Sequence, residues 1–286
     1  MDLTKITRGC VKSVAELIDL CEQLQGNAFE IRSGQWAYRG QPEEFGVLRP
    51  SFERKFSQQS YGTAELIENK LMEAFREHYK DLPDRSPDMP QPAQISEGHD
   101  MRCLSVMQHY EIPTRLLDWT TDFWTAVYFA CSSEPDKTAE LWYYRRSIFE
   151  KQRNADPSLW ALVDPSPNAA PEPSLRNRRW DSIVVEVDPR ISPRMREQHA
   201  HHTVSTSIFS DHAPVLIELG KSTQAEEPNS PEPIQRCLID GACKGRVLQF
   251  LAEPPLKVTA STIFPDVVGL GRFLRWQFDS LRTMLL

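Results

Sequence analysis

The fold is decided by residues 108–133, whose sequence is QHYEIPTRLLDWTTDFWTAVYFACSS. The first half is dense in polar side chains, and the second half is apolar with helical spacing. That spacing is shown by Phe123, Ala126, Val127 and Ala130. Pro113 restricts the residue before it and ends the preceding helix. Thr120, Thr121 or Asp122 can cap the next helix. The pattern predicts a polar loop held between two buried helices.

This predicted loop carries Thr114, Arg115 and Asp118, side chains that are suited to holding a polar ligand. Functional groups often lie on loops that a rigid scaffold positions. One interpretation is therefore a ligand site. The other is that Arg115 and Asp118 pair with each other and only fasten the loop, because structural ion pairs gather the same residue types.

Upstream of the loop, residues 35–40 alternate around Trp36 and Tyr38 and predict a strand. Gly40 allows a sharp turn directly after it. Arg39 would then lie at the end of a strand, a fixed position from which a guanidinium can bind phosphate or carboxylate. The alternative is an exposed arginine on an edge strand.

The remaining pattern predicts an α+β domain that spans residues 1–286, with a core at about 30–275. Helices are predicted at 13–24, 63–82 and 100–110, the first with Ser13 and Glu16 as a capping box. Residues 262–286 are predicted to begin with a turn at Pro265 and to end in a helix with one apolar face, formed by Leu270, Phe273, Leu274 and Phe278. Strands are predicted at 140–144, 181–187, 215–219 and 246–251. Proline-rich loops are predicted near 84–94, 154–173 and 224–233.

Composition narrows the class of protein. The chain has 286 residues, 40% hydrophobic and 26% charged, which is typical of globular domains. A net charge of -7 argues against non-specific nucleic-acid binding as the main role and leaves room for a local basic cleft. The six cysteines form no C-x-x-C pair, and no window resembles an export signal or membrane span. We expect a cytoplasmic protein without a membrane partner.

The sequence lacks the motifs of several common classes of enzyme. There is no G-x-S-x-G, no Walker loop and no G-x-G-x-x-G. His199, His201 and His202 form the cluster HAHH, but zinc needs three or four ligands with a suitable spacing. We therefore expect a solvated loop at HAHH and no metal site. A metal-dependent hydrolase using these histidines stays a weaker alternative.

Five short blocks of sequence carry a family resemblance. They lie between residues 35 and 274, in the order WAYRGQ, LRPSF, QHYEIPTRLLDWT, AVYFAC and IFPDVVGLGRFL. Together they resemble the FRG domain, a family named for an aromatic-Arg-Gly motif, which is Tyr38, Arg39 and Gly40 here. The family's second block, H-x-x-x-P-T-R-L-L-D-W-T, corresponds to His109 and the residues from 113 to 120.

The motifs of this family are similar to those of ADP-ribosyltransferases. The resemblance implies a mixed or antiparallel central sheet with flanking helices, and NAD as the substrate. Arg39 and Arg115 would clamp the diphosphate, while His109 and Asp118 would orient the ribose or the arginines. The other implied binding residues are Tyr38, Gly40, Thr114, Trp119, Thr120 and Tyr128.

A third element, a Glu or Gln acting on the acceptor, is where this chain departs from the family. The family's Arg-x-x-x-Gln-x-Gly-x-Phe pattern is matched only by Gln198, with Ala200 and His202 at its Gly and Phe positions. Glu218 is the alternative. The resemblance implies transfer of ADP-ribose from NAD to protein, nucleic acid or water, as in a bacterial toxin or phage-defence effector. The second hypothesis is an inactive nucleotide-sensing or partner-binding module.

Overall fold

The structure is a computed structural model that describes residues 3–29, 34–55, 61–82, 89–96, 99–155, 184–187, 195, 197–224, 232–265 and 267–285. Its strands are β1 (Thr7–Val11), β2 (Trp36–Gln41), β3 (Leu116–Thr120), β4 (Ala139–Arg145), β5 (Val184–Val187), β6 (Ala200–Ser205) and β7 (Ile234–Ile239). Its α-helices are α1 (Val14–Gln25), α2 (Tyr61–Lys80), α3 (Asp100–His109), α4 (Phe123–Cys131), α5 (Ser147–Ala155), α8 (His212–Gln224), α9 (Lys244–Ala252), α10 (Ala260–Ile263) and α11 (Val267–Leu285). Short 3-10 helices cover Thr4–Ile6, Glu53–Lys55, Pro92–Ile95 and Gly241–Cys243.

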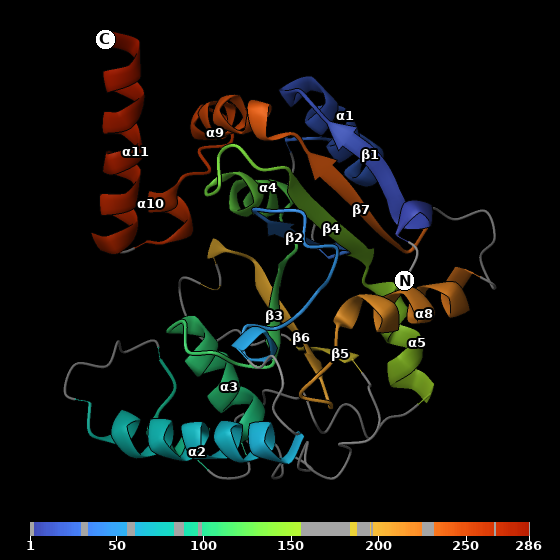
Figure 1. The fold of residues 1–286 in the computed structure, drawn as a ribbon, viewed down its shortest axis with the longest axis vertical. Helices are drawn as coiled ribbons and strands as arrows, with labels where there is room; N and C mark the ends of the chain where they lie inside the picture. The colour runs from blue at the N-terminus through green and yellow to red at the C-terminus, as the bar shows by residue number, and fades with distance from the viewer. Residues whose placement is uncertain are drawn as a thin grey trace.

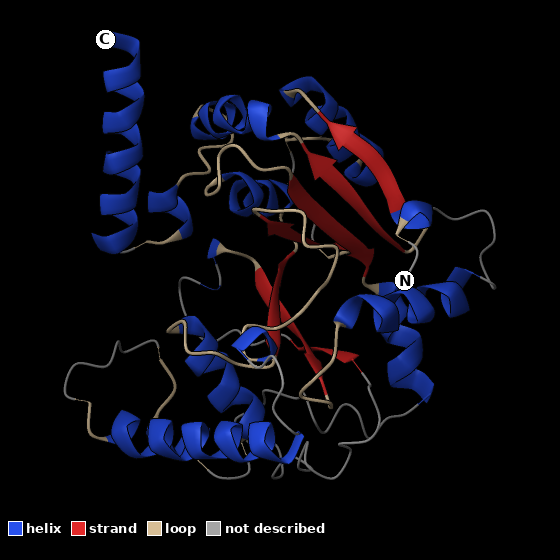
Figure 2. Cartoon of the chain, viewed as in Figure 1, coloured by secondary structure: helices blue, strands red, loops and turns tan. Residues whose placement is uncertain are grey.

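The seven strands form one mixed sheet in the order β1-β7-β4-β2-β3-β6-β5. Only the pairing of β1 with β7 is parallel among the described strand pairs. In the middle of the sheet, β2 meets β3 through a single pair, Tyr38 opposite Thr120. The strands therefore diverge at this point, and the sheet consists of two halves (Figures 1 and 2). The α+β class predicted from the sequence is confirmed, and of the mixed or antiparallel sheet that the resemblance implies, the structure has the mixed form.

Helices cover both faces of the sheet. Helices α1, α4 and α9 pack with β2, β4 and β7 around Leu17, Tyr38 and Val127. On the opposite face, α5 and α8 pack around Trp142 and Tyr144. Helices α2 and α3 cover the half formed by β3, β6 and β5. Because alternate strand residues enter different cores, β2 and β4 are buried on both faces.

Several predicted elements are confirmed, and their local signals explain them. The Ser13 hydroxyl accepts a hydrogen bond from the Glu16 backbone N–H at 3.3 Å, and α1 ends at Gly26 with a φ of 81°. Strands β2 and β4 and helices α2 and α3 lie close to their predicted positions. The carboxylate of Asp122 caps α4 by accepting from the Trp124 backbone N–H at 3.0 Å.

The predicted polar loop before α4 is wrong, because residues 116–120 form β3. Leu116 and Leu117 are both buried, and they enter cores on opposite faces of the sheet. An apolar residue on each face is the signature of a strand that is covered on both sides. Only Asp118 in this strand is exposed.

Two predicted strands are helices instead. Residues 215–219 belong to α8 and residues 246–251 to α9. The Asp211 carboxylate accepts from the backbone N–H of Ala213 at 3.0 Å and so caps the start of α8. The order of strands and helices is therefore mixed along the chain, and strands do not gather in the second half. Strand β1 was not predicted.

The predicted loops at 84–94, 154–173 and 224–233, and the start of the strand at 181–187, fall wholly or partly outside the described residues. Helix α11 was predicted with one apolar face, but Leu270, Leu274 and Phe278 are 47%, 51% and 62% exposed. Helix α11 extends beside α10 at the edge of the molecule (Figure 1). No described helix has both the length and the apolar character needed to cross a membrane.

Candidate functional site

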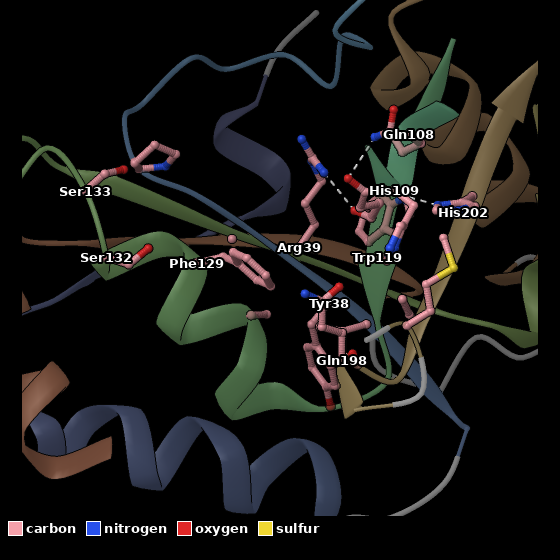
Figure 3. A pocket seen from close by; sticks show the side chains of 17 residues that line it. Tyr38, Arg39, Gln108, His109, Trp119, Phe129, Ser132, Ser133, Gln198 and His202 are labelled. Atoms are coloured by element: carbon pink, nitrogen blue, oxygen red, sulfur yellow. Dashed lines mark hydrogen bonds and ion pairs between the residues drawn. The ribbon is translucent and has the colours of Figure 1, made fainter. Parts of the chain in front are cut away.

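A cavity of about 360 Å³ lies where β2 and β3 diverge. It is bounded by β2, β3, the end of α3, helix α4 and the turn before β6 (Figure 3). Its lining residues are Tyr38, Arg39, Gly40, Pro42, Gln108, His109, Asp118, Trp119, Thr120, Ala126, Phe129, Ser132, Ser133, Met195, Gln198, Ala200 and His202. The cavity thus gathers residues from both blocks of the sequence that were predicted to carry function.

Gly40 permits the close packing of α4 on β2 beside the cavity. A Cβ atom at Gly40 would lie 2.0 Å from the Ala126 carbonyl oxygen and 2.5 Å from the Ala130 nitrogen. The glycine was predicted to provide a turn, but β2 continues to Gln41. Its role is instead the close approach of two backbones, for which any side chain is too large.

Arg39 directly follows the residue that joins β2 to β3, and its side chain enters the gap between these strands (Figure 3). Its Nη1 donates a hydrogen bond to the Asp118 carbonyl oxygen at 2.7 Å. Within the described part of the chain, its Nε has no hydrogen-bond partner. Burial lowers the pKa of Arg39 to about 10, although the nearby Asp118 carboxylate opposes this effect. The guanidinium remains charged at neutral pH and retains donors for a ligand.

Asp118 presents the only carboxylate among the described lining residues. Gln108 Nε2 donates to its Oδ2 at 2.8 Å, and His202 Nδ1 lies 3.1 Å from its Oδ1. The side chain is 54% exposed because it faces the cavity. Burial of the surrounding region raises the pKa of Asp118, but contacts with His202, Arg39 and Gln108 outweigh it and lower the pKa overall. The carboxylate is therefore ionised at neutral pH.

Thr114 orients the amide that holds this carboxylate. Its Oγ1 accepts from the Leu116 backbone N–H at 3.2 Å and donates to Gln108 Oε1 at 2.6 Å. Since Gln108 Oε1 is an acceptor, its Nε2 is directed to Asp118. Thr114 was predicted to bind the ligand, but it does not line the cavity and acts behind Gln108.

Thr120 and Gln198 join the two sides of the cavity. Thr120 Oγ1 donates to the Gln198 carbonyl oxygen at 2.7 Å, and the Thr121 N–H donates to the His199 carbonyl at 3.1 Å. The Gln198 amide lines the cavity, but its Nε2 donates to the Ile263 carbonyl at 3.2 Å. Gln198 was predicted as the third catalytic element, and the structure places it at the site with its amide nitrogen already engaged.

Arg115 lies outside this site. Its Nε donates to Glu68 Oε1 at 2.8 Å, its Nη2 pairs with Glu68 Oε2, and its Nη1 donates to the Thr206 carbonyl at 3.0 Å. It is 6% exposed and does not line the cavity. The predicted diphosphate clamp of two arginines is therefore not formed, and the alternative of an ion pair with Asp118 is also wrong. The guanidinium fastens α2 to β3 and the end of β6.

Glu218 is likewise remote from the cavity. It lies on α8, is 72% exposed and pairs with Lys221 at 3.1 Å. The prediction of a strand at this position underlies the error, because a strand would have brought its side chain to the sheet. Glu218 does not line the cavity.

His109 lines the cavity at the end of α3, and its ring contacts Tyr110 edge to face. The aromatic residues that the resemblance implies as binding residues do not all present their rings to this cavity. Tyr38 and Trp119 touch the cavity, but their side chains are 0% and 2% exposed and belong to the cores on opposite faces of the sheet. Tyr128 lines a neighbouring cavity instead. Phe129, like His109, lines the cavity and is partly exposed.

Three of the four HAHH residues, from Ala200 to His202, begin strand β6, which corrects the predicted loop, and His199 lies in the turn before it. His201 and His202 are buried neighbours in β6, and neighbours on a strand point to opposite faces. His201 Nε2 lies 3.3 Å from Glu186 Oε1, whereas His202 faces Asp118. In the described ranges no three His, Cys, Asp or Glu residues are grouped to hold a metal ion.

Sequence reasoning missed several lining residues. Gln108 stands in the opening stretch but was not assigned a role, and Ser132 and Ser133 follow the apolar run of α4. His202 is opposite Asp118 only because β6 pairs with β3. No local signal could have found that pairing, since the two residues are 84 positions apart in the sequence.

Part of the chain is similar to a known protein family. No curated protein and no solved structure matches the chain. Residues 34–139 match the family model described as the FRG domain. The matched region includes Arg39, Gln108 and Asp118, whereas Gln198 and His202 lie outside it. The part of the chain that provides β2, β3 and α4 to the cavity therefore matches the FRG domain family.

Proposed function

We propose that the chain is an ADP-ribosyltransferase-like enzyme that binds NAD in this cavity and transfers ADP-ribose to a macromolecular acceptor or to water. The observation that carries the proposal is the pair of opposite charges on the cavity wall, Arg39 and Asp118. The similarity of FRG motifs to those of ADP-ribosyltransferases supports the choice of substrate.

Arg39 would bind the diphosphate. It is fixed by one hydrogen bond to β3 and stays charged, so its other N–H groups can meet phosphate oxygens without a large loss of side-chain freedom. Since Arg115 is committed to Glu68, a single arginine would do this work. The cavity volume of about 360 Å³ is within the range of small-molecule sites.

Asp118 would stabilise the positive charge that develops on the ribose. In the reaction the bond between C1′ and the nicotinamide nitrogen breaks, and nicotinamide leaves with the bonding electrons. The acceptor atom then bonds to C1′ and releases its proton. A fixed, ionised carboxylate beside an oxocarbenium-like centre lowers the barrier. Gln108 and His202 hold Asp118 in place for this role.

A second candidate is a nucleotide-sensing or partner-binding module that has lost transfer activity. The observation that favours it is the state of the third element. The Gln198 amide nitrogen bonds to Ile263, and Glu218 is far from the cavity. In this case NAD or a related nucleotide would bind without turnover.

The test is nicotinamide release from NAD by the purified protein, with and without protein or nucleic-acid acceptors. We expect Asp118→Asn to retain NAD binding and to reduce release on the order of 100- to 1000-fold. Arg39→Gln should weaken NAD binding. Glu218→Gln removes an exposed carboxylate and serves as the matched control, with release unchanged.

The outcomes separate the candidates. Binding without release in the wild-type protein, under every acceptor condition, would favour the sensing module. If a folded wild-type protein neither binds nor cleaves NAD, both assignments of this ligand are wrong. Equal release by wild type and Asp118→Asn would remove Asp118 from the mechanism.

A further inference from the structure

A second cavity, of about 520 Å³, adjoins the first. It lies between α4, α9, α10 and α11, helices that stand beside one another in Figure 1. Phe129, Ser132 and Ser133 line both cavities. Only the end of α4 would therefore separate a ligand in the second cavity from a ligand in the first cavity.

The walls of the second cavity are rich in aromatic rings. Phe129 and Phe264 meet edge to face with centroids 6.1 Å apart. Phe273 and Trp276, on neighbouring turns of α11, are 6.0 Å apart with an angle of 30° between their planes. Both α11 rings are only partly buried, so their surfaces are available to a flat ligand.

The second cavity is also positively charged. Arg272 and Arg275 line it, and no described lining residue is acidic. The Arg272 guanidinium lies over the Phe264 ring at 4.9 Å, and its Nη2 is 3.9 Å from Glu111 Oε1. In a chain of net charge -7, two arginines beside an aromatic pocket make a local site for an anion.

We propose that this second cavity binds a nucleotide unit other than the NAD in the first cavity. The base would lie against the aromatic wall formed by Phe273 and Trp276, and the phosphate would meet Arg272 and Arg275. Aromatic stacking combined with arginine is how proteins hold bases without reading their sequence. The ligand is either a free mononucleotide or one unit of a single-stranded nucleic acid.

The position of the cavity gives this ligand a role, which rests on the proposed function. Because the two cavities share Phe129, Ser132 and Ser133, a nucleotide in the second lies next to NAD in the first. The second cavity is therefore the acceptor site of the transfer reaction. Binding itself does not depend on catalysis and is tested separately.

The experiment measures binding of 5′-AMP, adenosine, inorganic phosphate and a ten-nucleotide single-stranded DNA by calorimetry. It uses the full chain carrying Arg39→Gln, so that nucleotide binding in the first cavity is weakened. We expect 5′-AMP to bind more tightly than adenosine or phosphate alone. Adding Arg275→Gln or Trp276→Leu should weaken 5′-AMP binding on the order of tenfold. Arg246→Gln, an exposed arginine on α9 outside the cavity, is the matched control and should change nothing.

Each outcome is decisive. Unchanged 5′-AMP affinity in folded Arg275→Gln and Trp276→Leu proteins would overturn the proposal, as would equal affinity for adenosine and 5′-AMP. Loss of all 5′-AMP binding through Arg39→Gln alone would assign the nucleotide to the first cavity and also overturn it. Tighter binding of the DNA than of 5′-AMP identifies a strand as the source, and weaker binding identifies the free nucleotide. Retained 5′-AMP binding in a protein that does not bind NAD would separate this site from the proposed function.

Discussion

Replacing Arg115 by methionine tests whether this residue is structural. Arg115→Met keeps an unbranched, apolar stem of similar length and removes the guanidinium. In the native protein that group pairs with Glu68 and donates to the carbonyl oxygens of Thr206 and, at 3.4 Å, Ser205. The pair is almost completely buried, with side chains 7% and 3% exposed. The substitution therefore leaves the Glu68 carboxylate without its counter-charge.

The expected loss follows from this burial. Breaking a buried ion pair by removing one partner costs about 3–5 kcal/mol, because the remaining charge stays out of water. Replacing both partners by apolar residues is often close to neutral, so Glu68→Leu combined with Arg115→Met should recover most of the loss. The two single changes are thus expected to be strongly non-additive.

Urea denaturation measures the effect, with the transition followed by circular dichroism for the wild type, both single variants and the double variant. Binding of NAD by the folded Arg115→Met protein is the second readout, and it should be unchanged because Arg115 does not line the cavity. Additive destabilisation in the double variant would refute the buried-pair reasoning. Weakened NAD binding by a fully folded Arg115→Met protein would refute its exclusion from the site.

Three further predictions concern packing and buried polar groups. Gly40→Ala should destabilise the fold by about 1–3 kcal/mol or more, since the new Cβ would lie 2.0 Å from the Ala126 carbonyl oxygen. Gly245→Ala is the control and should not destabilise the fold, because its Cβ would meet no atom within 4 Å. The denaturation midpoints of the two variants measure the difference. Burial lowers the pKa of His212 from 6.5 to about 3, so between these pH values the unfolded chain binds a proton that the folded chain excludes. The free energy of unfolding should therefore fall as the pH drops from 6.5 towards 3, by at most about 5 kcal/mol. If the free energy of unfolding depends less steeply on pH in the wild type than in His212→Gln over this pH range, the effect does not come from His212. Lys244→Met removes the ammonium that donates to three backbone carbonyls, and it should lower the free energy of unfolding by about 1–3 kcal/mol. Thermal denaturation measures this loss. An unchanged midpoint would show that these hydrogen bonds contribute nothing to stability.

Local signals in the sequence predicted the elements that depend on neighbouring residues. The capping box at Ser13, the stop at Gly26 and the cap at Asp122 involve partners only two to four positions away, so the pattern contains the whole interaction. The errors at 215–219 and 246–251 arose in short apolar windows, where helix and strand have similar patterns. The cap at Asp211 was the available signal for α8.

The strand at residues 116–120 shows a different limit. Two adjacent leucines followed by a polar residue do not alternate, so the pattern did not predict a strand. Leu116 and Leu117 become strand residues because cores exist on both faces of the sheet. These cores are built from helices far away in the sequence, and tertiary packing overrides the weak local preference.

By itself the sequence determined the α+β class, the position of Arg39 on a strand and the apolar helix that follows Asp122. Only the tertiary structure decided which polar groups meet. Arg39 and Arg115 are the same residue type in equally informative motifs, but one enters the gap between β2 and β3 and the other is neutralised by Glu68, 47 positions away. Asp118 faces His202 because two strands pair across 84 residues. Charge and hydrogen-bonding partners at such separations are set by strand register and helix packing, which no local pattern of residues encodes.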